Sequence, residues 1–379
     1  MHCAFIVLYK EAMKILVWAS SYGHTIGGGP VLGPLLFGAL AARGHEVLVL
    51  TDHRPRTLPG EEDLAGVRVR RFPFREALGG DGRLFVTLRQ QVSQLRKNFD
   101  PDLIHIFSPG YSELFHHLTE TTPKSPLVVT LHDSFPARSF HPEAIIGRDV
   151  RAASWITACS QFVLRNARRH VPGIADRSSA ILNALPPPDV TPWAPLSGRP
   201  ELLYVGRLVE KKGVDLLLRA IDRLGGMTPA PTLTIIGKGD DEEGLKKLSE
   251  DLGIASRVTF AGSLDRKAVL ERMSACSMVV VPSRIEPFGL VALEAAQVGC
   301  PVVASRVDGL PEVIADRQTG LLVPPDDVNA LAASIMSIIG SPAEARRLGQ
   351  QARDRALNSF SWDAYVSAFD ALFRKLACL

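Results

Sequence analysis

Hydrophobic and polar positions along the chain alternate between two kinds of run. Short apolar runs rich in Val, Ile and Leu are typical of buried strands, and longer stretches between them have the apolar spacing of helices. Near-continuous apolar strands separated by helices predict a parallel sheet covered on both faces. The first strand is followed by a glycine-rich loop and by a helical stretch from Val31 to Arg43, which Gly44 ends. Strand candidates in the first half are Lys14–Ser20, Glu46–Leu50, Val67–Phe72, Leu103–Phe107, Leu127–Leu131 and Trp155–Ala158.

A proline-rich segment interrupts this alternation between Leu185 and Pro200, where six prolines fall within sixteen residues. A stiff segment of this kind is typical of an interdomain linker. The alternation then starts again, and the chain ends in a helical pattern from Ser361 to Leu379, with Ser361 placed to cap it. Strand candidates in the second half are Leu202–Val205, Thr232–Ile236, Arg257–Phe260, Met278–Val281 and Val302–Ala304.

The sequence therefore predicts an α/β fold of two doubly wound, Rossmann-like domains in tandem. We expect the first domain at 1–185, a linker at 186–200, the second domain at 201–355 and a C-terminal helix at 356–379. A start-like Met-Lys-Ile-Leu-Val sequence begins at Met13, so residues 1–12 are read as an upstream extension. Ligands of such sheets bind at the carboxyl ends of the strands, which places the expected site in a cleft between the domains.

Length and composition agree with two globular domains. A chain of 379 residues fits two domains of roughly 150–200 residues each, and 46% hydrophobic with 22% charged residues is typical of a globular protein. No apolar run approaches the ~18 residues that a membrane span needs. The five cysteines are scattered without metal-ligand or redox spacing, which favours reduced thiols and a cytoplasmic location.

Charge is distributed unevenly, although the net charge is only +3. Residues 1–185 hold 21 Lys and Arg against 16 Asp and Glu, whereas the remainder holds 22 against 24. A basic first domain is compatible with an acidic acceptor, with an anionic membrane at the inner face, or with an unevenly solvated surface. Residues 83–99 form a basic amphipathic helix candidate, for which packing into its own core is favoured over docking on a membrane. We expect no nucleic-acid partner, and the oligomeric state is left open.

The run from Val279 to Glu294 carries the most chemistry. A buried strand ends at Val281, and a helix is expected to begin near Gly289, where its first amides would hold an anion. Glu286 precedes this helix and Glu294 lies eight residues later, roughly 12 Å along a helix axis. One carboxylate could then meet a sugar and the other a ribose, with a diphosphate between them. The alternative is a helix with one capping carboxylate and one solvated glutamate.

Other candidates follow strand ends. Arg207 and Lys212 follow the first strand of the second domain and would neutralise a leaving diphosphate, unless they are merely solvated. Gly27–Gly29 follows the first strand of the chain but lacks a dinucleotide-binding or P-loop pattern. His132 would face the cleft or be structural, and His105 is assigned to the core. The sequence holds no cluster with metal-ligand spacing, and the pairs Asp240–Asp241 and Asp326–Asp327 are expected to be solvated.

Ten short motifs follow one another along nearly the whole chain, with the greatest density from Leu202 to Asp326. They are Gly27-Gly28 with Leu-Ala-Ala-Arg-Gly-His-Glu-Val47, Thr-Leu-His-Asp133, Cys159-Ser160, Gly206-Arg-Leu with Lys212-Gly213, Ile235-Ile-Gly-Lys-Gly239, Phe260-Ala-Gly262, Glu286-x7-Glu294, Pro301-Val-Val-Ala-Ser, Gly309-Leu-Pro-Glu312 and Thr319-Gly-Leu-Leu-Val323. This ordered set resembles that of the family-4 retaining glycosyltransferases with the GT-B fold. The sequence departs from the family pattern at Ala184, Asp240 and Asp308, where Gly, Pro and Gly are frequent.

The resemblance implies a set of site residues. The catalytic set would be His132, Arg207, Lys212 and Glu286, and the donor-binding set Gly27, Gly28, Gly206, Gly237, Gly262, Phe288, Gly289, Leu290, Val291 and Glu294. By the same resemblance, Arg207 and Lys212 would bind the donor diphosphate, Glu294 the ribose, and Glu286 the sugar hydroxyls. The amides of Gly289 and Leu290 would meet the distal phosphate, with Gly28 approaching from the opposite domain and His132 orienting the donor sugar.

The reaction implied is transfer of a sugar, with retention, from a nucleotide-diphosphate donor to a hydroxyl acceptor: a glycan, a glycolipid or a small molecule. Neither a metal nor another cofactor is expected, and a UDP-sugar is slightly favoured over GDP-mannose. By family resemblance the last helix would cross back onto the first domain. A sugar-nucleotide epimerase of the same fold and a catalytically silent nucleotide-sugar binding protein are the alternatives.

Overall fold

The structure is a computed structural model that describes residues 12–23, 28–80, 82–110, 112–119, 125–195 and 198–378. Its contacts divide the chain into two compact units. Unit 1 comprises Met1–Cys159, Val163–Ile181 and Asp363–Leu379, and unit 2 comprises Ser160–Phe162 and Leu182–Trp362. The chain thus enters unit 2 at Leu182, and the proline-rich segment at 186–200 lies within that unit, where Trp193 packs on its core. None of the described helices is both long and apolar enough to cross a membrane.

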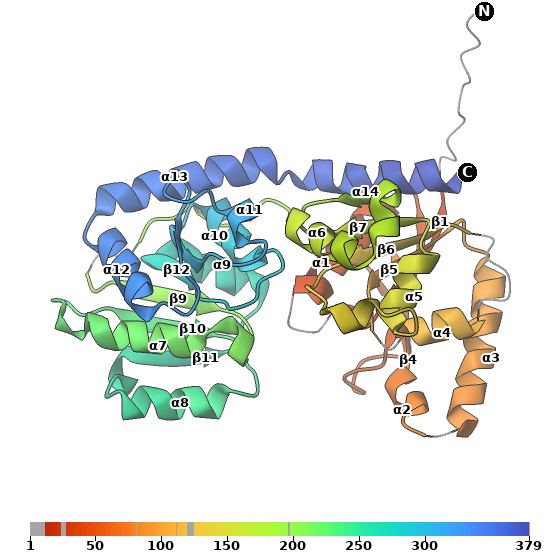
Figure 1. The fold of residues 1–379 in the computed structure, drawn as a ribbon, viewed down its shortest axis with the longest axis horizontal. Helices are drawn as coiled ribbons and strands as arrows, with labels where there is room; N and C mark the ends of the chain where they lie inside the picture. The colour runs from red at the N-terminus through yellow and green to blue at the C-terminus, as the bar shows by residue number, and fades with distance from the viewer. Residues whose placement is uncertain are drawn as a thin grey trace, which may run out of the picture. The chain divides into compact units, whose positions relative to one another are not determined.

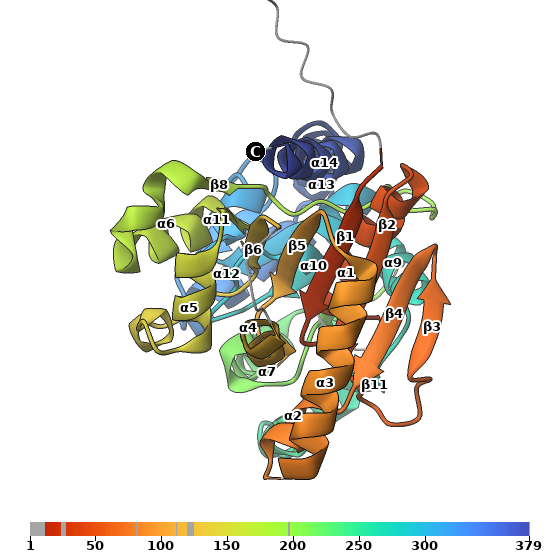
Figure 2. The same cartoon turned by 90° about the vertical axis from the view of Figure 1, so that its right-hand side faces the viewer.

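Unit 1 is built on one sheet in the order β3-β4-β2-β1-β5-β6-β7-β8, whose successive strands from β3 can be followed in Figure 2. All pairs are parallel except that of β3 with β4. The strands are β1 (Lys14–Ala19), β2 (Glu46–Asp52), β3 (Glu61–Leu64), β4 (Val67–Phe72), β5 (Leu103–Ser108), β6 (Leu127–Leu131), β7 (Trp155–Ala158) and β8 (Ser178–Ala180). The short strands β3 and β8 were not predicted, because β3 is a charged edge strand and β8 has three residues.

The helices of unit 1 fill the connections between its strands. They are α1 (Gly28–Ala42), α2 (Phe74–Leu78), α3 (Gly82–Phe99), α4 (Ser112–Thr119), α5 (Ile145–Ala152) and α6 (Gln161–His170), with 3₁₀ turns at Ala137–Phe140 and Pro172–Arg177. In α3 the residues Leu88, Val92 and Phe99 are buried, as the preferred packing hypothesis for this helix requires. His105 is also in the core, as predicted: its side chain is fully buried and hydrogen-bonds to Thr130 at 2.7 Å.

The C-terminal helix α14 (Trp362–Ala377) belongs to unit 1 from Asp363 onward. Its rings Phe369 and Phe373 lie 5.8 Å and 5.2 Å from the ring of His105. Asp370 on the same helix meets the Nε2 atom of the buried His45 at 3.1 Å. The helix therefore joins the core of the first unit although it is last in the sequence, as the fold resemblance predicted.

Unit 2 has a six-stranded parallel sheet in the order β11-β10-β9-β12-β13-β14. The strands are β9 (Glu201–Val205), β10 (Thr232–Ile236), β11 (Val258–Gly262), β12 (Met278–Val281), β13 (Val302–Ser305) and β14 (Leu321–Val323). The chain adds β10 and β11 on one side of β9 and then returns to add β12 on the other. The space between β9 and β12 is therefore a topological switch point, where the loops after the two strands diverge and leave room for a ligand.

Helices cover both faces of this second sheet. They are α7 (Val214–Arg223), α8 (Glu242–Asp251), α9 (Arg266–Ala275), α10 (Leu290–Val298), α11 (Leu310–Val313), α12 (Val328–Ile339) and α13 (Pro342–Ser359), with 3₁₀ turns at Glu210–Lys212, Leu224–Gly226 and Ala255–Arg257. Helix α7 packs beside α8 and α12, and α9 packs beside α10 (Figure 1). Strands added in opposite directions by right-handed crossovers place their helices on opposite faces. This arrangement brings the N-termini of α9 and α10 to the carboxyl edge of the sheet.

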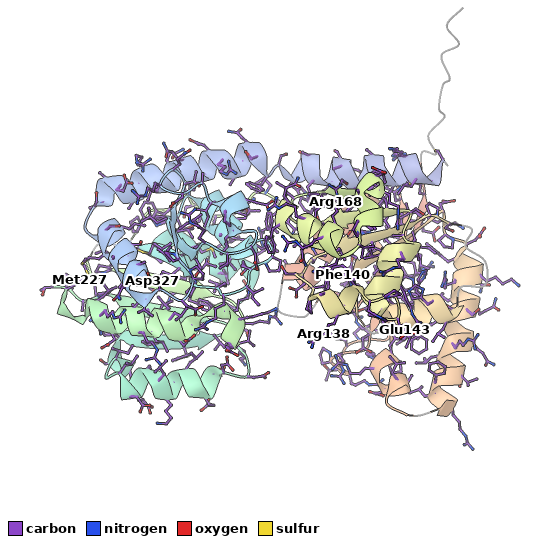
Figure 3. The ribbon with its side chains drawn as sticks, viewed as in Figure 1. Arg138, Phe140, Glu143, Arg168, Met227 and Asp327 are labelled. Atoms are coloured by element: carbon purple, nitrogen blue, oxygen red, sulfur yellow. The ribbon has the colours of Figure 1, made fainter. Side chains whose placement is uncertain are left out.

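The second aspartate pair was predicted to be solvated, and Asp326 is exposed while Asp327 is half-buried. Asp326 also accepts a hydrogen bond from the Nε atom of Arg284 at 2.6 Å. Asp327, labelled in Figure 3, caps α12 by accepting a hydrogen bond from the amide of Ala330 at 2.9 Å. An N-cap aspartate satisfies a helix amide that has no acceptor within the helix, which explains its position.

The packing of α14 leads to a first prediction. Phe373→Ala removes a fully buried ring beside His105 and Phe369, and such a truncation costs about 3–5 kcal/mol of folding free energy. We expect the urea unfolding midpoint of unit 1 to fall, as monitored by circular dichroism. Val86→Ala is the control, because Val86 lies in α3 of the same unit, is 53% exposed, and its truncation should cost less than about 0.5 kcal/mol. Equal losses in the two variants would contradict the packing of α14 on this core.

Candidate active site at the carboxyl edge of the second sheet

Two loops meet at the switch point of unit 2, and their backbones are joined. The carbonyl oxygen of Lys211, after β9, accepts hydrogen bonds from the amides of Arg284 at 2.9 Å and Ile285 at 3.2 Å, after β12. Gly213 has φ +65°, and a Cβ atom there would lie 2.1 Å from the carbonyl oxygen of Pro282. A glycine is therefore required at 213, and its close approach fixes the side chains on both loops relative to each other.

Lys212 and Glu286 form an ion pair across these loops. The Nζ atom of Lys212 lies 2.6 Å from the Oε2 atom of Glu286, and the two side chains are 16% and 15% exposed. Ser283 donates a hydrogen bond to the same oxygen at 3.3 Å. The amide of Glu286 donates to the Oδ2 atom of Asp308 at 2.9 Å. Glu286 is thus held at both its backbone and its carboxylate, and the orientation of the carboxylate is set by Lys212 and Ser283.

The N-terminus of α10 lies directly after Glu286. Gly289 has φ +100°, and a Cβ atom there would meet the Cδ2 atom of Leu310 at 2.6 Å, so this position requires glycine. No side chain among the described residues caps the helix. The first amides of a helix have no acceptor within it and carry partial positive charge, which favours an anion at this end. Phe288, predicted as a donor-binding residue, is buried, and its ring lies 5.9 Å from that of Phe360.

Glu294 lies in the second turn of α10 and pairs with a cation from another helix. The Nε atom of Arg266, the first residue of α9, donates to the Oε1 atom of Glu294 at 3.1 Å. Burial raises the pKa of the Glu294 carboxyl, and the guanidinium of Arg266 opposes this shift. Two glutamates of the predicted site therefore each have a cationic partner within the same unit.

Three predicted glycines lie at the carboxyl ends of the adjacent strands β9, β10 and β11. Gly206 donates its amide to the carbonyl of Ile236 at 3.0 Å, and Gly237 donates to that of Gly262 at 2.7 Å. A Cβ atom on Gly237 would lie 1.8 Å from the carbonyl oxygen of Gly206. Because Gly237 has no side chain, the ends of β9 and β10 can approach each other closely.

Of the remaining predicted residues, Arg207 belongs to unit 2, His132 and Gly28 belong to unit 1, and Gly27 lies outside the described residues. The side chain of Arg207 is exposed, and its carbonyl accepts from the hydroxyl of Tyr204 at 2.9 Å. His132 belongs to unit 1, where it packs edge-on against Phe107 at 4.5 Å between ring centroids. Burial lowers the pKa of His132 to about 4, so its ring is neutral near pH 7. Gly28 begins α1, and Gly27 lies outside the described residues.

Sequence reasoning missed several residues that shape the site. Ser283, Asp308 and Arg266 were not predicted, although each contacts Glu286 or Glu294 directly. Asp308 was noted only as a departure from the family pattern, and the structure gives it φ +45°. Arg266 had a weak signal, a basic residue directly after the N-cap Asp265. Among the described residues no group of three or more His, Cys, Asp or Glu side chains is arranged to hold a metal ion.

Comparison with known proteins agrees with this geometry. The family described as Glycosyl transferases group 1 matches residues 192–355, and Glycosyltransferase Family 4 matches residues 35–187. The chain is 32% identical over 397 aligned positions to a glycogen synthase of Mycobacterium tuberculosis, covering 94% of this chain and 93% of the relative. The chain belongs to the family 4 glycosyltransferases of the GT-B fold. The resemblance predicted from the ordered motifs is thereby confirmed.

Solved structures share the architecture of this glycosyltransferase. Sucrose-phosphate synthase from Thermosynechococcus elongatus aligns with a TM-score of 0.81 at 25% identity, covering 96% of this chain and 99% of that one. HepE from Anabaena, solved in complex with UDP-glucose, aligns with a TM-score of 0.80 at 22% identity, covering 96% and 100%. The predicted fold class, two Rossmann-like α/β domains of the GT-B type, is confirmed.

The joined loops lead to a prediction on stability. Gly213→Ala places a methyl group against the carbonyl of Pro282 at a residue with left-handed φ. Gly253 has a similar φ of +68°, but an added Cβ atom there would have no other atom within 4 Å, so Gly253→Ala is the control. We expect Gly253→Ala to cost about 1–2 kcal/mol from backbone strain alone. We expect Gly213→Ala to cost about 1–3 kcal/mol more from overpacking, measured by urea unfolding of unit 2. If the two variants unfold at the same denaturant concentration, the loops after β9 and β12 are not in contact at 213.

Proposed function

We propose that the glycosyltransferase moves a hexosyl group from a UDP-sugar to a hydroxyl of an acceptor, with retention of the anomeric configuration. The observation that carries this proposal is the Lys212–Glu286 ion pair beside the uncapped N-terminus of α10. This arrangement supplies a cation and helix amides for a diphosphate, next to a carboxylate that is already oriented for hydroxyl groups.

Charge on the leaving group is the main demand of such a reaction. When the bond between the anomeric carbon and the phosphate oxygen breaks, negative charge grows on the departing diphosphate. Lys212, the exposed Arg207 and the amides of Gly289 and Leu290 would stabilise this charge. Groups fixed before the reaction stabilise developing charge without a reorganisation cost, and the joined loops fix Lys212 in this way.

Glu286 suits a role in orienting the sugar rather than in attacking it. Its Oε2 atom already accepts hydrogen bonds from Lys212 and Ser283, so this oxygen is engaged by the protein itself. We propose that its carboxylate accepts hydrogen bonds from sugar hydroxyls. The acceptor oxygen would attack the same face that the phosphate leaves, and the departing phosphate oxygen would take the proton of the acceptor hydroxyl. His132 would contribute a neutral ring to orient the donor sugar from the first unit.

The nucleotide portion would bind at the carboxyl edge of the sheet in unit 2. Glu294 would accept hydrogen bonds from the ribose hydroxyls, and the glycines at 206, 237 and 262 would leave space for the nucleotide above the strand ends. A uridine nucleotide is favoured over a guanosine nucleotide by the shared fold with HepE, which was solved with UDP-glucose. The proposal includes a metal-independent reaction in the cytoplasm, and an acceptor that is a glycan, a glycolipid or a small molecule.

Two substitutions separate binding from turnover. We expect Glu294→Ala to weaken UDP binding about 10- to 100-fold by calorimetry, because hydrogen bonds to a charged group contribute about 1.5–3 kcal/mol. We expect Lys212→Ala to lower kcat by about 10²–10³ with a smaller effect on KM, because its charge matters most in the transition state. Glu271→Ala and Lys247→Ala, both on exposed helix positions of unit 2, are the matched controls. Unchanged binding and turnover in both site variants would refute this donor site.

Product analysis tests the reaction itself. Incubation with a UDP-sugar and candidate acceptors should give a glycoside whose anomeric proton coupling, measured by NMR, matches that of the donor. Activity should persist when EDTA is added. An inverted anomer would refute retention, and an epimerised nucleotide sugar would favour the epimerase alternative. A screen in which UDP binds without any turnover across glycan, glycolipid and small-molecule acceptors would favour a silent binding protein.

A further inference from the structure

Arg266 occupies an electrostatically unfavourable place in its own helix. Helix α9 begins at Arg266 and has Lys267 next to it, with no acidic residue in its first turn. The N-terminus of a helix carries partial positive charge, so two cations there are unfavourable for the helix. The N-cap Asp265, which accepts from the amide of Ala268 at 2.8 Å, offsets part of this cost. The position of Arg266 therefore needs a reason other than the stability of α9.

The contacts of Arg266 point to Glu294. The Nε atom of Arg266 donates to the Oε1 atom of Glu294 at 3.1 Å, and the two side chains are 28% and 12% exposed. The Nη2 atom of Arg266 is buried and has no hydrogen-bond partner among the described residues. A buried donor without an acceptor is costly, so an additional ligand oxygen or a water is needed to complete this guanidinium. The Nε atom therefore donates to the carboxylate of Glu294, whereas the Nη2 atom still requires an acceptor.

We propose that Arg266 is a positioning residue that fixes the carboxylate of Glu294 for the vicinal hydroxyls of a ribose. This inference rests on the proposed function, in which Glu294 binds the ribose of the donor. Arg266 holds the Oε1 atom of Glu294 from the side of α9, which restricts the orientation of the carboxylate.

The chemistry of a hydroxyl group fits this pair. A hydroxyl has one proton to donate and two lone pairs that accept, whereas an ionised carboxylate only accepts and a guanidinium only donates. A ribose hydroxyl can therefore donate to Glu294 while it accepts from the buried Nη2 atom of Arg266. Two adjacent hydroxyls on one ring could contact the Glu294 carboxylate and the Arg266 guanidinium together. The ligand class is therefore a nucleoside diphosphate with an intact ribose.

A cycle of two ligands and several variants tests the inference. The ligands are UDP and 2′,3′-dideoxy-UDP, which lacks both ribose hydroxyls, and their affinities are measured by calorimetry. We expect Arg266→Gln to weaken UDP about tenfold but dideoxy-UDP less than about twofold, because the two changes act on the same contact. Arg266→Lys, which keeps the charge but not the fixed fork of donors, should fall between the wild type and Arg266→Gln.

Arg272→Gln on the same helix is the matched control. The guanidinium of Arg272 lies 3.3 Å from the carboxylate of Glu201, away from α10, so its removal should leave both affinities unchanged. Thermal unfolding of each variant confirms that it is folded, and Arg266→Lys carries the test if Arg266→Gln does not fold.

The outcomes separate this inference from the proposed function. Equal loss of UDP and dideoxy-UDP affinity in Arg266→Gln would assign Arg266 to the general structure of the site or to the base, and would overturn the inference. Unchanged UDP affinity in Arg266→Gln would also overturn it, while a loss in Glu294→Ala would leave the proposed function standing. If Glu294→Ala itself binds UDP as the wild type does, the proposed donor site fails and the inference fails with it.

Discussion

The site in unit 2 depends on the contact between the loop after β9 and the loop after β12. The sheet topology separates these strands' connections and sends them to opposite faces, which leaves a gap at the carboxyl edge. The chain closes part of this gap with backbone contacts: Lys211 accepts two amides from the other loop, and Gly213 allows contact with Pro282. The side chain of Arg284 also joins the two loops, because its Nη1 atom donates to the carbonyl oxygen of Glu210 at 2.8 Å. These contacts bring Lys212 and Glu286 together.

A site built in this way suits an anionic leaving group. Lys212 and Arg266 each lie beside a carboxylate, so the charges within these two pairs balance. Glu286 and Glu294 are then held in place before a ligand arrives, and the amides of α10 add partial positive charge without a mobile side chain. In the proposed reaction, the diphosphate of the donor would add negative charge next to Lys212 and the helix terminus, which would stabilise it. The arrangement is therefore better suited to stabilising negative charge that develops on a leaving group than to binding a charge that stays constant.

Much of the fold was readable from the sequence, because apolar strands and helical spacing report burial on two faces directly. The long strands, the restart after the prolines and the strand-end positions of Lys212 and Glu286 all followed from that pattern. The short strands β3, β8 and β14 did not, since β3 and β8 lack the apolar residues that marked strands of similar length such as β7 and β12, and β14 has only three residues. The proline-rich segment appeared as a linker, yet Trp193 within it donates from Nε1 to the carbonyl of Cys276 at 2.7 Å and packs on unit 2. The partner of Trp193 lies 83 residues away in the sequence, so the local pattern of the proline-rich segment does not indicate this packing.

The two glutamates show where sequence reasoning about a site ends. Eight residues of separation suggested two carboxylates serving one ligand, and the spacing alone also permitted an acid and base pair. Their surroundings differ in a way that the spacing does not encode. Glu286 is tied to a lysine and a serine in a loop, whereas Glu294 lies within a helix and meets an arginine from α9, 28 residues away in sequence. General acid and base catalysis needs one carboxyl that readily holds a proton and one that readily accepts it. Each carboxylate already accepts a hydrogen bond from a cationic side chain, so the pair is better suited to orienting hydroxyl groups than to moving protons.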